Sequence, residues 1–74
     1  MLFMGIKYRQ DNFANNLKIL REKTGKSQIK VSTEMDINHR TYQRLENNEI
    51  QDVKLSIVIK ILKYYDINLE ELLR

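Results

Sequence analysis

Two arginines, Arg40 and Arg44, stand four positions apart in a segment that also carries His39 and Thr41. If this segment is helical, positions 40 and 44 lie about one turn apart on the same face. A guanidinium group is a planar fork of donors that fits a phosphate or the O6 and N7 acceptors of guanine. Taken alone, such a pair is more often a solvated face that binds nothing. The surrounding elements must decide between these two interpretations.

The chain lacks the residue combinations that enzymes and metal sites use. It has no Cys and a single His, His39, so the usual set of metal ligands cannot form. Glu70 and Glu71 are adjacent on a terminal segment, and no nucleophile stands with a base and no glycine-rich phosphate loop is present. At 74 residues, the chain is about half the usual domain size. We therefore expect one small domain that is not an enzyme and has no cofactor, metal or small-molecule ligand.

Charge is distributed unevenly along the chain. The net charge is +3, yet residues 1–45 hold nine basic and four acidic residues, whereas residues 46–74 hold four basic and six acidic residues. This asymmetry suggests that the first part faces a nucleic acid. No apolar run reaches the ~20 residues of a membrane span, and the first residues do not resemble a secretory signal. We predict a cytoplasmic protein that does not contact a membrane.

The chemistry-bearing segment belongs to a series of short predicted helices, separated by residues that end or begin helices. Gly25 can close a helix over 12–24 in the left-handed conformation, and Ser27 can cap the next one. The tripeptide Asp-Ile-Asn occurs at 36–38 and again at 66–68. In both copies, Asp can take the left-handed position, Ile can pack back on the preceding helix and Asn can cap the following one.

These signals predict an all-α domain over residues 12–74. Residues 1–11 are expected to form an N-terminal arm that is either a strand or disordered. Asp52 is a candidate cap of the fourth helix. The five helices are predicted over residues 12–24, 28–35, 39–46, 53–65 and 69–73.

The second and third predicted helices have the features of a helix-turn-helix over residues 28–46. Two short helices that cross steeply need a small residue at the crossing, and Ser32 stands there. Val31, Met35 and Tyr42 can pack from the two sides, together with Ile37 and Leu45. The turn between the helices is short, as the motif requires.

At this level the chain resembles the Xre/Cro/lambda-repressor-like family of helix-turn-helix DNA-binding domains, over roughly residues 13–73. The resemblance is carried by Leu17, Leu20 and Arg21, by Ser27-Gln28, by Leu45-Glu46-Asn47, and by the closing run Ile67-Asn68-Leu69-Glu70-Glu71-Leu72. Three positions depart from the family pattern, with Ser32 in place of Ala, Asp36 in place of Gly and Val53 in place of Pro. The resemblance implies a five-helix lambda-repressor-like fold.

The resemblance also implies roles for individual residues. The third helix would enter the major groove of DNA, and its base-reading residues would be His39, Arg40, Thr41 and Arg44. Phosphates would be held by Lys26, Ser27, Gln28, Asn38, Asn47 and Asn48. Arg21 and Glu46 correspond to the family's structural ion pair, so we exclude both from the DNA contacts.

The fourth predicted helix is apolar over most of its circumference. We expect Leu55, Val58, Ile59, Leu62 and Tyr65 to form its inward face. Ile57, Ile61 and Tyr64 extend the apolar arc sideways, beyond the stripe that a small domain can cover by itself. Either the N-terminal segment or a second subunit must cover this strip. We favour a dimer, whose predicted interface consists of these three residues and Leu73. A two-fold dimer would present two recognition helices about 34–36 Å apart to a palindromic site.

The residues and the resemblance together predict a sequence-specific double-stranded DNA-binding transcriptional regulator, in the form of a dimeric repressor acting at a palindromic operator. The alternative is a helical protein–protein interaction module that has the same fold and does not bind DNA. Basic residues on the third helix favour the DNA-binding interpretation. A phage-type repressor, a restriction-modification controller and an antitoxin remain equally compatible with the sequence.

Overall fold

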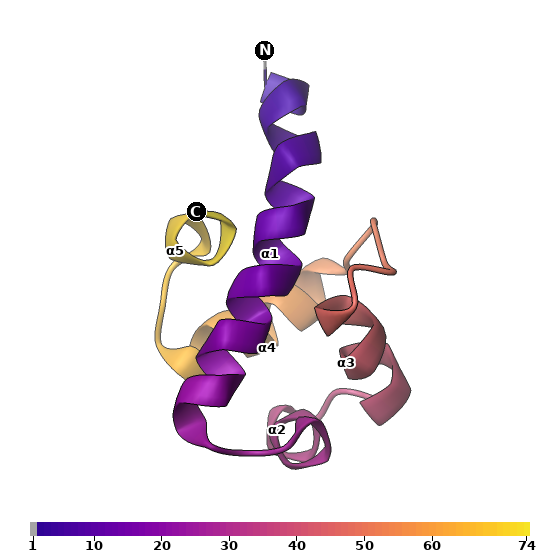
Figure 1. Ribbon diagram of the computed structural model, residues 1–74, viewed down its shortest axis with the longest axis vertical. Coiled ribbons are helices and arrows are strands. Elements are labelled where there is room, and N and C mark those ends of the chain that lie inside the picture. The colour runs from indigo at the N-terminus through magenta and orange to yellow at the C-terminus, as the bar shows by residue number, and fades with distance from the viewer. Residues whose placement is uncertain (1) are drawn as a thin grey trace.

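The computed structural model describes the backbone of residues 2–74 and the side chains of residues 12–74, and this part of the chain contains helices and no strand. The predicted all-α fold is confirmed, and α2, α3 and α5 have the predicted bounds. No helix among the described residues is long and apolar enough to cross a membrane. The helices are α1 (Leu2–Thr24), α2 (Gln28–Met35), α3 (His39–Glu46), α4 (Leu55–Tyr65) and α5 (Leu69–Leu73) (Figure 1).

Helix α1 is longer than the sequence predicts. It begins at Leu2 rather than at residue 12, so the structure differs from the strand or disordered arm that we expected over 1–11. Residues 2–11 contain no Pro, and half of them, Leu2, Met4, Lys7, Arg9 and Gln10, are of types that propagate a helix well. Residue 1 and the side chains of residues 2–11 lie outside the described part of the chain. A division of the chain near residue 12 stays a prediction.

The ends of α2 follow the predicted cap chemistry. The Ser27 side chain accepts a hydrogen bond from the backbone N–H of Lys30 at the start of the helix. Asp36 takes the left-handed conformation at the end, with φ of 60°. The N–H of Ile37 then bonds to the carbonyl of Ser32 at 2.9 Å, and Asn38 caps α3. Each cap satisfies a backbone group that the helix itself leaves without a partner, so the short turn is fixed locally.

The second copy of Asp-Ile-Asn repeats this geometry between α4 and α5. Asp66 is left-handed with φ of 54°, and Asn68 forms a capping box with Glu71. Helix α5 is then held against α1 by two side-chain amides. Asn16 Nδ2 donates to the carbonyl of Leu72 at 2.8 Å, and Asn12 Nδ2 donates to the carbonyl of Arg74 at 3.0 Å. These bonds satisfy carbonyls at the end of a helix only five residues long.

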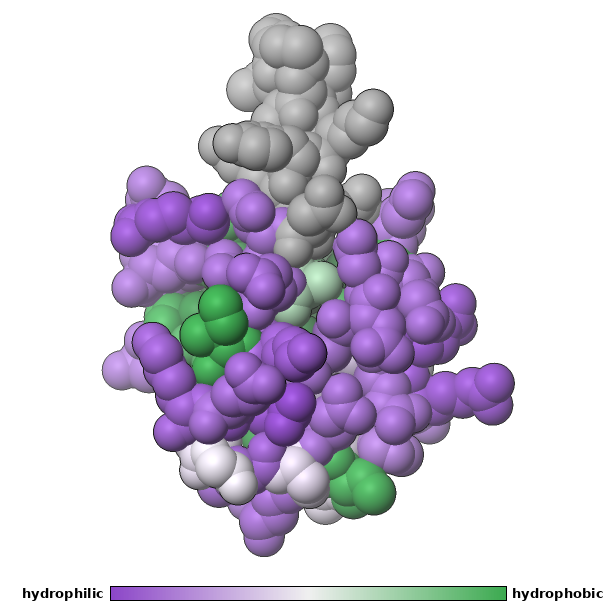
Figure 2. Space-filling model, viewed as in Figure 1, coloured by the Kyte–Doolittle hydropathy of each residue, from purple (hydrophilic) through white to green (hydrophobic). Residues whose placement is uncertain are grey.

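The hydrophobic core is formed by residues of all five helices. Over the described residues, the face shown in Figure 2 is largely hydrophilic, so the apolar side chains gather inside. In Figure 1, α1 runs in front of α4, with α5 on one side and α3 on the other. Leu17, Tyr42 and Leu72 are fully buried, as the predicted apolar spacing of these helices requires. The buried core cluster comprises Phe13, Leu17, Val31, Met35, Ile37, Tyr42, Leu45, Ile61 and Leu72.

Helix α4 corrects two predictions. It begins at Leu55 rather than at residue 53, and Asp52 does not cap it, because Lys54 holds the N-cap position without a side-chain bond. The helix is also rotated relative to the predicted inward face: Leu55 is 72% exposed and Ile59 is 42% exposed. Eight of the eleven residues of this helix are apolar or aromatic, so its pattern alone does not fix which stripe turns inward.

The same rotation removes one residue from the predicted dimer interface, and the rest of that interface stays a prediction. Ile61 is completely buried in the core, so its assignment to an interface is wrong. Ile57, Tyr64 and Leu73 are half-buried and pack against the core cluster. The exposed apolar residues of α4 are instead Leu55 and Ile59.

Candidate nucleic-acid interface

Helices α2 and α3 pack directly against each other. Ser32 lies buried at their junction, and its hydroxyl donates to the carbonyl of Ile29 at 2.9 Å, so this polar side chain is satisfied inside α2. Val31 and Tyr42 are fully buried beside it. A small residue at this place lets the two helices approach closely, as the sequence predicted.

The predicted base-reading residues lie on the outer side of α3. His39, Arg40 and Arg44 are exposed, and Thr41 is half-buried. Asn38 caps this end of the helix, since its Oδ1 accepts from the backbone N–H of Thr41 at 3.1 Å. The cap anchors the first turn of α3. The structure therefore brings polar and cationic side chains together on one accessible helix with a defined start.

Arg44 has an acidic neighbour that the sequence analysis did not assign. Its Nε lies 3.5 Å from Oε1 of Glu49, in the loop that follows α3. Both side chains are about half exposed, at 52% and 53%, so water weakens the pair.

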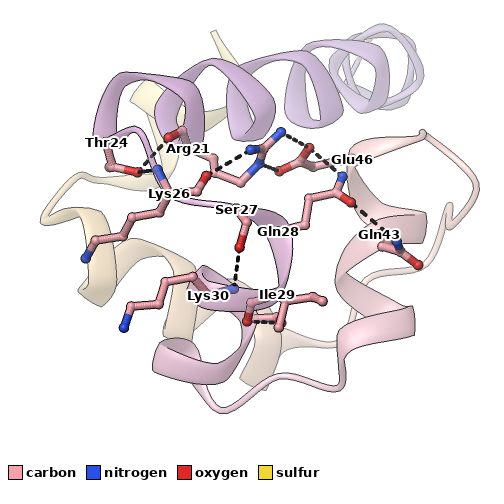
Figure 3. Close-up of polar contacts among 10 residues, drawn as sticks. Arg21, Thr24, Lys26, Ser27, Gln28, Ile29, Lys30, Gln43 and Glu46 are labelled. Atoms are coloured by element: carbon pink, nitrogen blue, oxygen red, sulfur yellow. Dashed lines mark hydrogen bonds and ion pairs between the residues drawn. The ribbon is translucent and has the colours of Figure 1, made fainter.

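A buried polar network holds α1, α2 and α3 together (Figure 3). Arg21 Nε donates to Oε2 of Glu46 at 2.7 Å, and Nη2 donates to Oε1 at 3.2 Å, which is the ion pair that the sequence predicts. Arg21 Nη1 also donates to the carbonyl of Lys26 at 3.0 Å. The Glu46 side chain is only 1% exposed. This carboxylate is therefore a structural group inside the domain rather than a surface charge.

Two glutamines extend this network toward the surface. Gln28 Nε2 donates to Oε1 of Glu46 at 3.0 Å, and Gln43 Nε2 donates to Oε1 of Gln28 at 3.4 Å. The side-chain amide that we predicted as a phosphate ligand thus already joins α2 to α3. Sequence reasoning missed Gln43, since a lone Gln on an exposed helix gives no sign of such a partner.

The environment of Glu46 keeps its carboxylate charged. Burial opposes ionisation, but the interactions with Arg21, Tyr42 and Gln28 outweigh it, so the pKa of Glu46 lies below its ordinary value. Breaking a buried pair by removing one partner leaves an uncompensated charge inside the protein. The orientation of α2 relative to α3 therefore depends on this group.

Of the predicted phosphate ligands, Lys26 points away from the others. Its Nζ donates to Oε1 of Glu34 at 2.9 Å and to the hydroxyl of Tyr64 on α4 at 3.4 Å. In Figure 3, its side chain extends in the direction opposite to Gln28 and Gln43. Lys26 is therefore directed toward Glu34 and Tyr64, and the structure does not bring it together with Gln28 and Gln43.

The remaining predicted phosphate ligands border the two helices. Ser27 stands at the start of α2 and Asn38 at the start of α3. Asn47 forms the C-cap of α3, and Asn48 takes the left-handed conformation with φ of 60°. These residues lie at the ends of α2 and α3, where backbone groups without intrahelical partners are concentrated.

The tyrosines among the described side chains, Tyr42, Tyr64 and Tyr65, are buried or half-buried. Tyr42 is fully buried, and Tyr64 and Tyr65 meet edge to face with ring centroids 4.9 Å apart. The hydroxyls of Tyr42 and Tyr65 are buried without a hydrogen-bond partner among the described residues. This arrangement gives no row of exposed rings for stacking on single-stranded bases. Within the same part of the chain, no group of three His, Asp or Glu residues could hold a metal ion.

Comparison with known proteins agrees with this geometry. No curated protein and no solved structure matches the chain. The family HTH_3, described as helix-turn-helix, matches residues 17–72, which include α2, α3, α4 and most of α5. Members of this family carry Cro/C1-type, Xre-like DNA-binding domains and are typically not enzymes. Because the match covers well over half of the chain, the protein belongs to the HTH_3 family of helix-turn-helix DNA-binding domains.

Proposed function

We propose that this DNA-binding domain acts as a sequence-specific transcriptional regulator, a repressor that reads the major groove of double-stranded DNA with α3. The observation that carries the proposal is the exposed face of α3 with Arg40 and Arg44, on a helix whose last residue is anchored by the Arg21–Glu46 pair. Specific binding needs a rigid reading helix, since a misplaced donor loses its base contact.

Arg40 and Arg44 are the residues that we assign to guanine. Each can donate two parallel bonds to O6 and N7, and each such contact discriminates by ~1–3 kcal/mol. His39 and Thr41 adjoin them and complete the reading face. With Arg44 at the far end of the helix, the face spans more than one turn.

Phosphate contacts would flank this face. The first amides of α2, beside Ser27 and Gln28, have no intrahelical partner and point out of the positive end of the helix. Asn38, Asn47 and Asn48 would add neutral contacts at the ends of α3. Lys26 would contribute at longer range, because its ammonium group is paired with Glu34. These contacts would set the register of the protein on DNA and carry no sequence information.

Repression at a palindromic operator requires two copies of the domain. The residues that support a two-fold dimer are Leu55 and Ile59, two exposed apolar side chains one turn apart on α4. Apolar side chains of this size are costly to leave in water, and a second copy would cover them. The two recognition helices would then lie about 34–36 Å apart or at a multiple of that spacing.

Selection of bound sequences from a random duplex pool tests this proposal. The wild-type protein is expected to enrich one site with two-fold symmetry, whose half-sites contain guanine. Arg40→Ala and Arg44→Ala should weaken or change the enriched site. Lys63→Ala, which removes an exposed cation on α4, serves as the matched control and should retain it. A pool without any enriched sequence would contradict the proposal and favour the protein-interaction module.

A further inference from the structure

Three helices of this chain end with a left-handed residue followed by a backbone bond to the last turn. After α2 and α4, the residue that closes this turn is an isoleucine, Ile37 or Ile67, whose N–H bonds to a carbonyl five residues earlier at 2.9 Å and 3.1 Å. An apolar residue is common there, since it packs back on the helix it has just left.

The turn after α3 has the same backbone and a different side chain. Asn48 is left-handed with φ of 60°, and the N–H of Glu49 bonds to the carbonyl of Arg44 at 2.9 Å. Glu49 thus occupies the position that Ile37 and Ile67 occupy elsewhere. Where the isoleucines make an apolar contact with the preceding helix, Glu49 makes an ion pair, with its Oε1 3.5 Å from Nε of Arg44.

The backbone fixes the position of Glu49 beside the last turn of α3. Because the N–H of Glu49 is bonded to the last turn of α3, its Cα is fixed relative to Arg44 whether or not the side chains interact. A half-exposed ion pair contributes little to stability. The effect that we consider is on the orientation of Arg44, because the pair restricts a long side chain that otherwise samples many rotamers.

The carboxylate approaches the guanidinium at Nε. The two Nη groups form the other end of the fork, and this end can donate two parallel bonds to the O6 and N7 atoms of guanine. We infer that Glu49 is a positioning residue for DNA reading: it orients Arg44 so that the Nη groups face the base. This inference rests on the proposed function, because it assigns the orientation of one of its reading residues.

The test compares affinities of Glu49 variants for two duplexes, one enriched from the random pool by the wild-type protein and one with its sequence scrambled. In Glu49→Ala and Glu49→Gln, the ratio of the two affinities should fall roughly threefold to tenfold. Affinity for the scrambled duplex should rise in both, because a negative charge near the phosphates is gone. Asp52→Asn removes an exposed acid of the same loop that forms no ion pair among the described residues, and it should leave the ratio unchanged.

A double-mutant cycle with Arg44 separates positioning from general charge. In an Arg44→Ala background, Glu49→Ala should change the ratio no further. Thermal melting of each variant should stay close to wild type, since the loop keeps its backbone bond. An unchanged ratio in both Glu49 variants, or an equal rise for the two duplexes, would overturn the inference and leave base reading by Arg44 intact. Failure of the wild-type protein to enrich any duplex would instead overturn the proposed function itself.

Discussion

Gln28, the first residue of α2, donates a hydrogen bond from Nε2 to Oε1 of Glu46, the last residue of α3, over 3.0 Å. The same carboxylate pairs with Arg21 of α1. One buried charge thus fixes three helices, two of which form the DNA-facing motif. The geometry of the proposed reading face consequently depends on Arg21 and Glu46, which we do not expect to touch DNA.

Removing one member of the ion pair should be costly. Arg21→Ala is expected to lower the free energy of unfolding by about 3–5 kcal/mol, because Glu46 would remain as an unpaired buried charge. The double variant Arg21→Met/Glu46→Leu should recover much of this loss. Lys23→Ala, an exposed cation on the same helix, is the control. Urea unfolding followed by circular dichroism measures all of them, and an Arg21→Ala midpoint near wild type would refute the assignment.

The stability of the domain should depend on pH through Glu46. Its pKa in the folded protein lies below the ordinary value of 4.5, because interactions with Arg21, Tyr42 and Gln28 outweigh its burial. A lowered pKa means that the stabilisation is complete above pH ~4.5 and is lost as the pH falls through the folded-state pKa. Glu46→Gln should be less stable than wild type at neutral pH and should lose less stability on acidification. The unfolding midpoints of wild type and Glu46→Gln are measured over a range of acidic pH. If both fall by the same amount, stability does not depend on pH through Glu46.

Two adjacent tyrosines should respond in opposite directions to loss of the hydroxyl. Tyr65 has a buried hydroxyl without a partner among the described residues, so Tyr65→Phe should raise stability or leave it unchanged, by up to about 1 kcal/mol. The Tyr64 hydroxyl donates to Oε1 of Glu34 and accepts from Lys26, so Tyr64→Phe should lower stability by about 0.5–1 kcal/mol. Thermal melts at one pH compare the pair directly. A larger loss in Tyr65→Phe than in Tyr64→Phe would show that the Tyr65 hydroxyl is satisfied in solution.

The proposed dimer makes a separate prediction for α4. Leu55→Glu should abolish self-association and leave the fold intact, because this side chain is 72% exposed. Ile61→Glu should unfold the domain, because it would place a carboxylate in the core. Sedimentation at several concentrations, together with circular dichroism, distinguishes the two effects. A wild-type protein that stays monomeric at high micromolar concentration would exclude this interface.

The turns and helix caps were the features best predicted from the sequence, because each depends on a few neighbouring residues. Both Asp-Ile-Asn turns are found with left-handed Asp36 and Asp66 and with capping asparagines, since each turn is set by a few local hydrogen bonds. The start of α1 was less predictable, because no Pro stands upstream of residue 12 to exclude a longer helix.

The inward face of α4 required the tertiary structure. The helix is apolar over most of its circumference, and its orientation is seen only from the packing that buries Ile61 in the core. The neighbouring Lys60 Nζ donates to the carbonyl of Asp36, just after α2, at 2.7 Å. The direction of Lys26 likewise depends on Glu34 and on Tyr64, which is distant in sequence. The contacts of Gln43 and Glu49 were not predicted, because the spacing of polar residues in a sequence does not indicate which partners they meet.

The central claim is that α3 reads base sequence through Arg40 and Arg44. Its most direct test is an anisotropy titration of wild type, Arg40→Ala and Arg44→Ala against the selected duplex and its scrambled form over a range of salt. For wild type, log affinity should fall linearly with log salt on both duplexes. Each variant should lose ~1–3 kcal/mol on the selected duplex and much less on the scrambled one. Equal affinity of the wild-type protein for the two duplexes, or equal losses on both in the variants, would contradict base reading by α3.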